Sequence, residues 1–156
     1  MMLATHALVG AAIGDKIDNP WIIIAASLAM HYFLDSFRHG EYVESFDSKV
    51  AFKNTWWKIV LDFFSGLIIV LLIIHYQNFD RAKTLNILLG SFASMFPDLL
   101  TLLYWKFKFP ILGKIYRFHA WAHKYPRNAP ERQWNFRNSA NDIIFSLIAI
   151  IIIFIK

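Results

Sequence analysis

The stretch WWKIVLDFFSGLIIVLLIIHY, which runs from Trp56 to Tyr76, decides the fold class of this chain of 156 residues. A helix needs about 20 mostly apolar residues to cross the hydrocarbon core of a bilayer, and this stretch supplies them. A second stretch of the same kind runs from Thr84 to Trp105. These segments predict a membrane protein built from helices, because a helix satisfies its own backbone hydrogen bonds in lipid.

Three shorter apolar stretches lie on either side of this pair, at residues 2–14, at residues 21 to about 37, and at residues 143–155. The first is too short to span a bilayer alone, since its 13 residues would form a helix of about 20 Å. Its Gly10 and Gly14 form a GxxxG pair, a pattern that brings membrane helices into close contact. We therefore expect this helix to lie inside the bundle. Before the second stretch, Asn19 and Pro20 predict a helix cap followed by proline at the first helical position.

The composition agrees with a single integral membrane domain over residues 1–156. The chain is 57% hydrophobic and only 17% charged, which leaves too little polar surface for a soluble domain of this size. It has no cysteine, so disulfides, thiolate metal sites and cysteine nucleophiles are excluded. We predict an all-α, polytopic bundle of about five membrane helices with one interfacial amphipathic helix.

The amphipathic helix is predicted in the long segment from Lys106 to Asn138. Apolar residues recur there at helical spacing, which is typical of a helix lying at a membrane surface. They are Ile111, Leu112, Ile115, Tyr116, Phe118, Trp121 and Ala122, with His119 among them. Pro126 and Pro130 end the pattern.

The distribution of basic residues predicts the orientation. Two loops on the same side of the predicted bundle carry most of them: Arg38, Lys49, Lys53, Lys106, Lys108, Lys114, Arg117, Lys124, Arg127, Arg132 and Arg137. The other side carries Lys16, Arg81, Lys83 and Lys156. Basic loops face the cytoplasm, so we expect the N-terminus and both basic loops on the cytoplasmic side of the inner membrane. The same rule accounts for the net charge of +5, and no nucleic-acid partner is expected.

Histidines and aspartates fall at one depth of the predicted bundle, near the cytoplasmic ends of its helices. His31, Asp35 and His39 step by four and share one helix face. The other members come from every remaining segment: His6, Asp62, Asp98, His119, His123 and Asp142. Ionisable residues are costly inside a membrane and mark functional sites. One shared depth therefore predicts one shared site.

The residue types predict a metal centre. Neutral imidazole and carboxylate are ligands for zinc and related divalent ions. The predicted metal ligands are His6, His31, Asp35, Asp98, His119 and His123, with His39 and Asp142 supporting them from a second layer. Asp62 is predicted as a further ligand or as the catalytic base that orients water. Arg38, Arg117 and Arg127 are the candidates for holding a phosphate. The His119-Ala-Trp-Ala-His123 pair lacks the glutamate of the zinc-protease helix, which argues against a metalloprotease.

Four short motifs resemble the membrane-bound metal-dependent hydrolases, a family of inner-membrane proteins with a LexA-regulated member. They are Met2-Leu-Ala-Thr-His6-Ala-Leu-Val-Gly10, Met30-His31-Tyr-Phe-Leu-Asp35-Ser36, Met95-Phe-Pro97-Asp98 and His119-Ala-Trp-Ala-His123. The chain resembles a divergent member: Leu100 stands where the family has a second aspartate, and the arginine and threonine of the two-histidine motif are missing. The His-x-x-x-Asp helix also precedes the Pro-Asp motif here, in the reverse of the expected order.

That family is similar in motif to the superfamily of zinc-dependent phospholipase C and single-strand nucleases. The resemblance implies zinc-dependent hydrolysis of a phosphoester. The location at a membrane surface favours a lipid or polyprenyl phosphate as substrate. Two alternatives stay open: a metal-binding or metal-transporting membrane protein, and a structural membrane module whose polar residues pair internally. The oligomeric state is not predicted.

Overall fold

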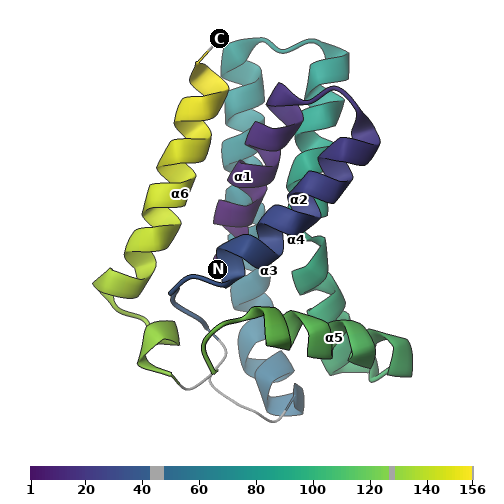
Figure 1. The fold of residues 1–156 in the computed structure, drawn as a ribbon, viewed down its shortest axis with the longest axis vertical. Coiled ribbons are helices and arrows are strands. Elements are labelled where there is room, and N and C mark those ends of the chain that lie inside the picture. Colours follow the sequence, from purple (N-terminus) through teal and green to yellow (C-terminus); the bar gives the residue numbers. More distant parts are fainter. Residues whose placement is uncertain (43–47, 127–128, 156) are drawn as a thin grey trace.

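The computed structural model describes residues 1–42, 48–126 and 129–155, and within them every regular element is a helix. The elements are α1 (Leu3–Lys16), α2 (Pro20–Asp35), α3 (Ser48–Gln77), α4 (Arg81–Phe107), α5 (Pro110–Ala122), the short 3₁₀ helix η1 (Pro130–Arg132) and α6 (Phe136–Phe154). Figure 1 shows α1, α3, α4 and α6 running along the long axis of the molecule. The predicted all-α class is confirmed. Arg127 and Lys156 lie outside the described residues.

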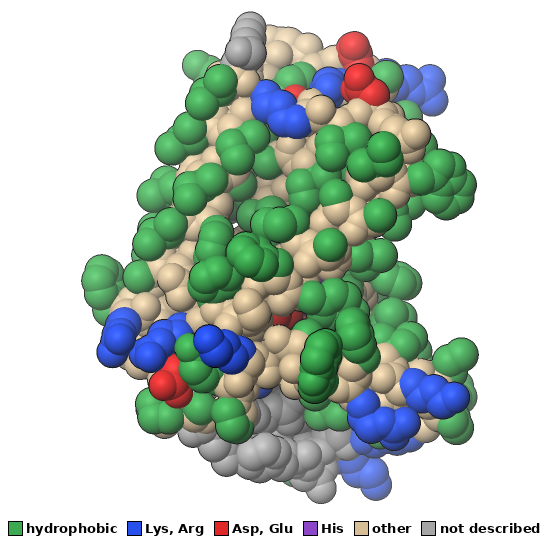
Figure 2. Space-filling model, viewed as in Figure 1, with side chains coloured by type: hydrophobic (Ala, Val, Ile, Leu, Met, Phe, Trp, Pro, Cys, Tyr) green, Lys and Arg blue, Asp and Glu red, His purple; other side chains and the backbone are tan. Residues whose placement is uncertain are grey.

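Three helices are long and apolar enough to cross a membrane, which indicates a membrane protein: α3 through its residues Phe52–Gln77, α4, and α6. The predicted count of five spans is not confirmed, because α1 has 14 residues and α2 has 16. Figure 2 shows hydrophobic side chains covering the middle of the molecule, while charged side chains gather toward its two ends. The predicted cap of α2 is confirmed, since the Asn19 side chain accepts hydrogen bonds from the N–H groups of Trp21 and Ile22, and Pro20 is the first helical residue.

Helix α1 lies inside the bundle, as its glycines predicted. A Cβ atom added to Gly10 would come within 2.2 Å of the Gly90 carbonyl oxygen on α4, and one added to Gly14 within 2.1 Å of the Asn86 carbonyl oxygen. The two backbones therefore touch, and only glycine fits at these contacts. One turn away, the Ser91 hydroxyl donates to the Ala7 carbonyl at 3.0 Å. Gly66 on α3 provides a similar close approach to Ala4.

The start of α1 is held by carboxylates from two other helices. The first N–H groups of a helix have no partner within the helix, and Met2 at the N-cap offers no side-chain hydrogen bond. Asp62 on α3 accepts from the N–H groups of Leu3 at 2.6 Å and Ala4 at 3.2 Å. Asp142 on α6 accepts from the N–H of Met2 at 2.8 Å. These bonds fix α1 at the level where the histidines gather.

Helix α5 has the amphipathic character that the sequence predicted. It lies across the long axis of the molecule, below α1 and α2 in Figure 1. Ile111 and Trp121 are 70% and 77% exposed, whereas His119 and Gly113 face inward and are buried. Its inward face covers the ends of α2 and α4 and delivers His119 to the interior.

Candidate metal centre

The carboxylate of Asp35, at the last residue of α2, is the centre of a buried cluster of imidazoles. The side chain is almost fully buried. Its Oδ1 lies 3.2 Å from Nε2 of His6 and 2.6 Å from the Met1 amino group. Its Oδ2 lies 3.2 Å from Nε2 of both His31 and His119. Because an isolated buried carboxylate is very costly, this environment has to supply positive charge close to Asp35.

His31 is held in one tautomer by the backbone of α4. It precedes Asp35 by four residues, so both side chains lie on one face of α2. Its Nδ1 lies 2.7 Å from the Ser94 carbonyl oxygen, which can only accept, so Nδ1 carries a proton and donates it. Nε2 then faces Asp35 at 3.2 Å, but no hydrogen bond of acceptable geometry forms there among the described residues. Metal-binding histidines are typically oriented in this way, with the second ring nitrogen donating to a carbonyl.

Helices α4 and α5 bring a second carboxylate and two more histidines to the cluster. Nε2 of His119 lies 3.5 Å from Oδ1 of Asp98, and its Nδ1 lies 3.2 Å from the Thr101 hydroxyl. His123 follows at the end of α5, with Nε2 3.5 Å from Oδ2 of Asp35. The rings of His119 and His123 stack with centroids 5.0 Å apart. The spacing of four residues on α5 therefore directs both imidazoles to the same carboxylate.

His39, beyond the end of α2, completes the cluster from the other side. Its Nδ1 donates to the Phe37 carbonyl at 2.9 Å, and its Nε2 is buried with no hydrogen-bond partner among the residues described. Burial, reinforced by the nearby Met1 ammonium, lowers the pKa of His39 to about 3. Burial also lowers the pKa of His123 well below its usual value. Both imidazoles are therefore neutral at pH 7, and neutral imidazole is the form that binds metal.

The side chains form two groups that share Asp35. The first group is His31, Asp35, Asp98 and His119; the second is Asp35, His39 and His123. Within each group one potential ligand atom per residue lies within 4.8 Å of all the others. With bonds of roughly 2.0–2.2 Å, two ligand atoms of a tetrahedral zinc ion lie about 3.3–3.5 Å apart. The distances of 3.2–3.5 Å from Oδ2 of Asp35 to three imidazole nitrogens fit that spacing. The residues present therefore fit a divalent metal.

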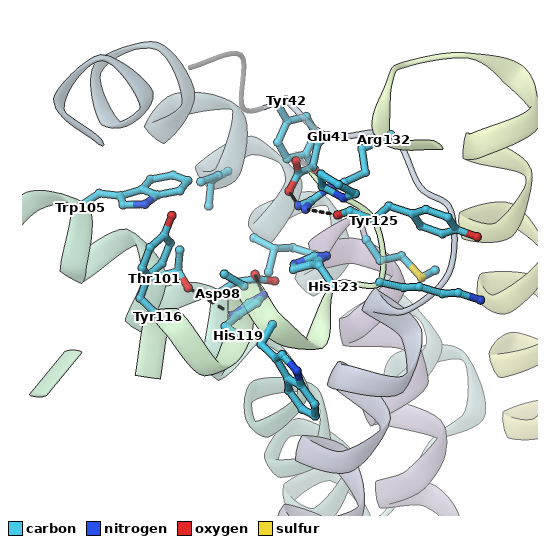
Figure 3. A pocket seen from close by; sticks show the side chains of 18 residues that line it. Glu41, Tyr42, Asp98, Thr101, Trp105, Tyr116, His119, His123, Tyr125 and Arg132 are labelled. Carbon is cyan, nitrogen blue, oxygen red and sulfur yellow. Dashed lines mark hydrogen bonds and ion pairs between the residues drawn. The ribbon is translucent and has the colours of Figure 1, made fainter. Parts of the chain in front are cut away.

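A cavity of about 520 Å³ opens beside the cluster. Asp98, His119 and His123 face into it in Figure 3, and Arg132 lies beside the same space. Arg132 is buried and pairs with Glu41, and its NH1 donates to the Tyr125 carbonyl at 3.0 Å, while its Nε has no hydrogen-bond partner within the described ranges. Aromatic side chains form much of the remaining wall: Tyr42, Trp105, Tyr116, Trp121 and Tyr125. The cavity thus joins candidate metal ligands, a buried cation and apolar surface.

The structure separates the predicted site residues into two sets. It brings together His31, Asp35, Asp98, His119, His123 and His39, and it places His6 on the opposite oxygen of Asp35, outside both groups. Asp62 and Asp142 are engaged at the start of α1 and do not line the cavity. Arg38 lies 3.6 Å from Glu131, and Arg117 is exposed on α5; neither lines the cavity. The phosphate-binding and catalytic assignments of these residues stay predictions.

Sequence reasoning did not single out Arg132, Glu41 and Tyr42. Tyr42 donates a hydrogen bond to Asp62, and burial raises its pKa. All three lie outside the apolar helices, so depth along a helix gave no signal for them. A buried Arg-Glu pair is visible in a sequence only as two ordinary loop charges.

Replacing Asp62 by alanine tests its role at the start of α1. The carboxylate accepts three hydrogen bonds, from Leu3, Ala4 and Tyr42. Losing these acceptors leaves buried donors unsatisfied, so the free energy of unfolding should fall by about 2–3 kcal/mol. Unfolding of the detergent-solubilised variant, followed by circular dichroism, measures this loss. A variant of unchanged stability with greatly reduced turnover would instead support the catalytic assignment.

Comparisons with protein-family models, curated proteins and solved structures found no match to this chain. The resemblance to membrane-bound metal-dependent hydrolases therefore rests on the sequence motifs alone.

Proposed function

We propose that this chain is a membrane-embedded, metal-dependent hydrolase that cleaves a phosphoester of a lipid or polyprenyl substrate. The observation that carries the proposal is the Asp35 cluster, in which Nδ1 of both His31 and His39 donates to a backbone carbonyl while the buried Nε2 has no hydrogen-bond partner among the described residues. His31 and His39 each present this Nε2 close to the Asp35 carboxylate, and a cation held there would satisfy both nitrogens. A divalent metal, with zinc as the best candidate, supplies that cation.

The proposed ligands follow from the two groups. His31, Asp98 and His119 would hold one ion and His39 and His123 a second, with Asp35 shared between them. When bound, such ions lower the pKa of water and polarise a phosphoryl oxygen. Asp98 reaches the cavity and can accept a hydrogen bond from a water there. Thr101 contacts Nδ1 of His119 and fixes the orientation of that ring.

The cavity favours an anionic substrate with an apolar part. Arg132 and Lys124 line it together with Glu41 and Asp98, and guanidinium and ammonium groups bind phosphate. The Arg132 Nε, buried without a hydrogen-bond partner among the described residues, is the donor we assign to a phosphate oxygen. Arg132 thus takes the part that the sequence had suggested for Arg38 and Arg117. The aromatic wall would contact the organic portion of the substrate.

The location is part of the proposal. The cluster lies toward the α5 end of the molecule, the end that carries Lys106, Lys108, Lys114 and Lys124. Under the positive-inside rule this end faces the cytoplasm, so the cluster would lie at the cytoplasmic surface of the inner membrane. Transport of metal across the bilayer is a weaker alternative. The part of α3 beyond the cluster, residues 67–74, is entirely Leu, Ile and Val and offers no polar path.

Elemental analysis of detergent-purified, zinc-reloaded protein tests the metal centre. Wild-type protein should hold stoichiometric zinc, and His31→Ala should lower metal affinity by at least about 100-fold, since even outer-shell partners of a metal site contribute 10–100-fold. His75→Ala is the matched control, because His75 is exposed near the far end of α3. The same samples are then assayed for phosphate release from lipid phosphates. A folded wild-type protein that takes up no metal would contradict the proposal.

A further inference from the structure

A second cavity, of about 390 Å³, lies in a groove between α3 and α4. Its wall is almost entirely apolar and is made by Leu3, Ile59, Val60, Phe63, Phe64, Phe92, Met95, Phe96, Leu99 and Leu102. Four of these side chains, Phe64, Phe92, Phe96 and Leu99, are about half exposed. The groove is therefore open along the surface of the bundle, on helices that are apolar and long enough to span a membrane.

The groove adjoins the cavity at the metal centre. Leu3 and Ile59 line both spaces. On α4, Asp98 and Thr101 line the polar cavity, while their neighbours Leu99 and Leu102 line the groove. The carboxylate and imidazole groups thus lie beside the groove, and none of the described residues on the wall of the groove is charged.

The groove also has the depth of one leaflet. On α4 it runs from Phe92 to Leu102, which is about 15 Å at 1.5 Å per residue. The hydrocarbon core of a bilayer is about 30 Å thick, so this length covers about half of it. A chain that lies in the groove with its polar end at the cavity therefore stays within one leaflet.

From this adjacency we infer that the groove binds the hydrocarbon chain of a lipid monophosphate whose phosphate occupies the polar cavity. Arg132 and Lys124 line the cavity beside the carboxylates Glu41 and Asp98, and the metal of the proposed function would add the positive charge that favours phosphate over an uncharged headgroup. Burying the chain against Phe, Leu and Val side chains supplies the affinity. The inference rests on the proposed function, which assigns phosphate binding to the cavity. It adds that the substrate carries an alkyl or prenyl chain, which lies between α3 and α4.

Photolabelling tests the groove separately from turnover. The probe is hexadecylphosphonate with a diazirine in the far half of its chain; its C–P bond resists hydrolysis. Zinc-loaded protein in phosphatidylcholine nanodiscs is irradiated with the probe, and labelled peptides are mapped. Labels should concentrate on Ile59–Phe64 of α3 and Phe92–Leu102 of α4. Unlabelled hexadecyl phosphate should compete with the probe, whereas hexadecanol should not.

Two blocking variants fill the groove from opposite walls. Leu99→Trp and Val60→Trp should each reduce labelling at least about tenfold, the equivalent of losing about two buried methylenes. Leu72→Trp, on the exposed surface of α3 away from the groove, should label as the wild type does. Circular dichroism verifies that each variant is folded. Because the two substitutions lie on different helices, one of them still tests the groove if the other variant is unstable.

The outcomes separate this inference from the proposed function. Labels spread evenly over the lipid-facing helices, or labels that hexadecanol displaces equally well, would overturn the groove even if hexadecyl phosphate is hydrolysed. Labels confined to the groove, competed by hexadecyl phosphate and lost in the blocking variants, support it even if no hydrolysis is found. In that second case the hydrolase proposal alone fails.

Discussion

Under the proposed function, Asp35→Asn should lose both bound zinc and phosphoesterase activity, the latter by at least about 10³-fold. Asp35 is the residue common to both groups of potential ligands, and its Oδ2 lies 3.2–3.5 Å from three imidazole nitrogens. A metal ion contributes several kcal/mol of transition-state stabilisation, and each 1.36 kcal/mol or so is a factor of ten in rate. The amide keeps the shape of the side chain but removes the charge that would bridge the ions. Metal content and initial rates on a lipid phosphate measure the effect.

The matched control for this variant is Asp18→Asn, which changes an exposed carboxylate at the other end of the bundle. Metal content and rate should there stay at the wild-type level. If Asp35→Asn lowers stability while zinc content is at background in both the variant and the wild type, Asp35 is a structural residue. The imidazoles around it then serve as hydrogen-bond partners, as in the structural-module alternative.

Gly10→Ala should destabilise the bundle by about 2 kcal/mol or more. The added methyl group would meet the backbone of α4, with the Gly90 carbonyl oxygen at 2.2 Å and the Ser91 Cα at 2.9 Å. Backbone cannot rotate aside, so α1 has to move away from α4, and overpacking of this kind costs about 1–3 kcal/mol or more. The loss exceeds the gain of about 1 kcal/mol that alanine brings to a helix interior. Unfolding by titration with a denaturing detergent, followed by helical circular dichroism, measures the difference.

Gly113→Ala is the matched control, because the added methyl group there meets a side chain and not backbone. Its nearest neighbour is a ring carbon of Tyr104 at 3.2 Å, and a side chain can shift by a few tenths of an ångström. This variant should change the free energy of unfolding by less than about 1 kcal/mol. Equal stability of the two variants would contradict a backbone contact between α1 and α4.

The fold class was predictable because its signals are local. Length and apolar composition predicted α3, α4 and α6, and the Asn19-Pro20 pair predicted the start of α2. The small residues of α1 predicted an interior helix without long-range information. The number of spans was not predictable, because α1 and α2 are apolar but short, and such helices can also be buried by other helices.

The histidine cluster was predictable from depth alone, because His31, Asp35, Asp98, His119 and His123 all lie near the same ends of their helices. Depth does not give the direction in which a side chain points around the helix axis. For this reason the sequence did not show that Asp62 and Asp142 point toward the start of α1. Both lie at the same depth as the histidines, but they accept hydrogen bonds from the first N–H groups of α1, which Met2 does not cap. One signal was present in the sequence: Met2 cannot cap a helix, so carboxylates from elsewhere were needed to do so.

The enclosed position of α1 has a consequence for biosynthesis. This helix touches α2, α3, α4 and α6, and it carries His6 and Asp15 with little apolar side-chain area to hold it in lipid alone. Its main partner, α4, is translated much later: at roughly 5–20 residues per second, the about 90 residues between the ends of α1 and α4 take on the order of 10 s to synthesise. During that interval the first helix has no glycine surface to dock against. Helix α1 is therefore made before the surface that buries it, and it can reach its native place only after α4 has followed.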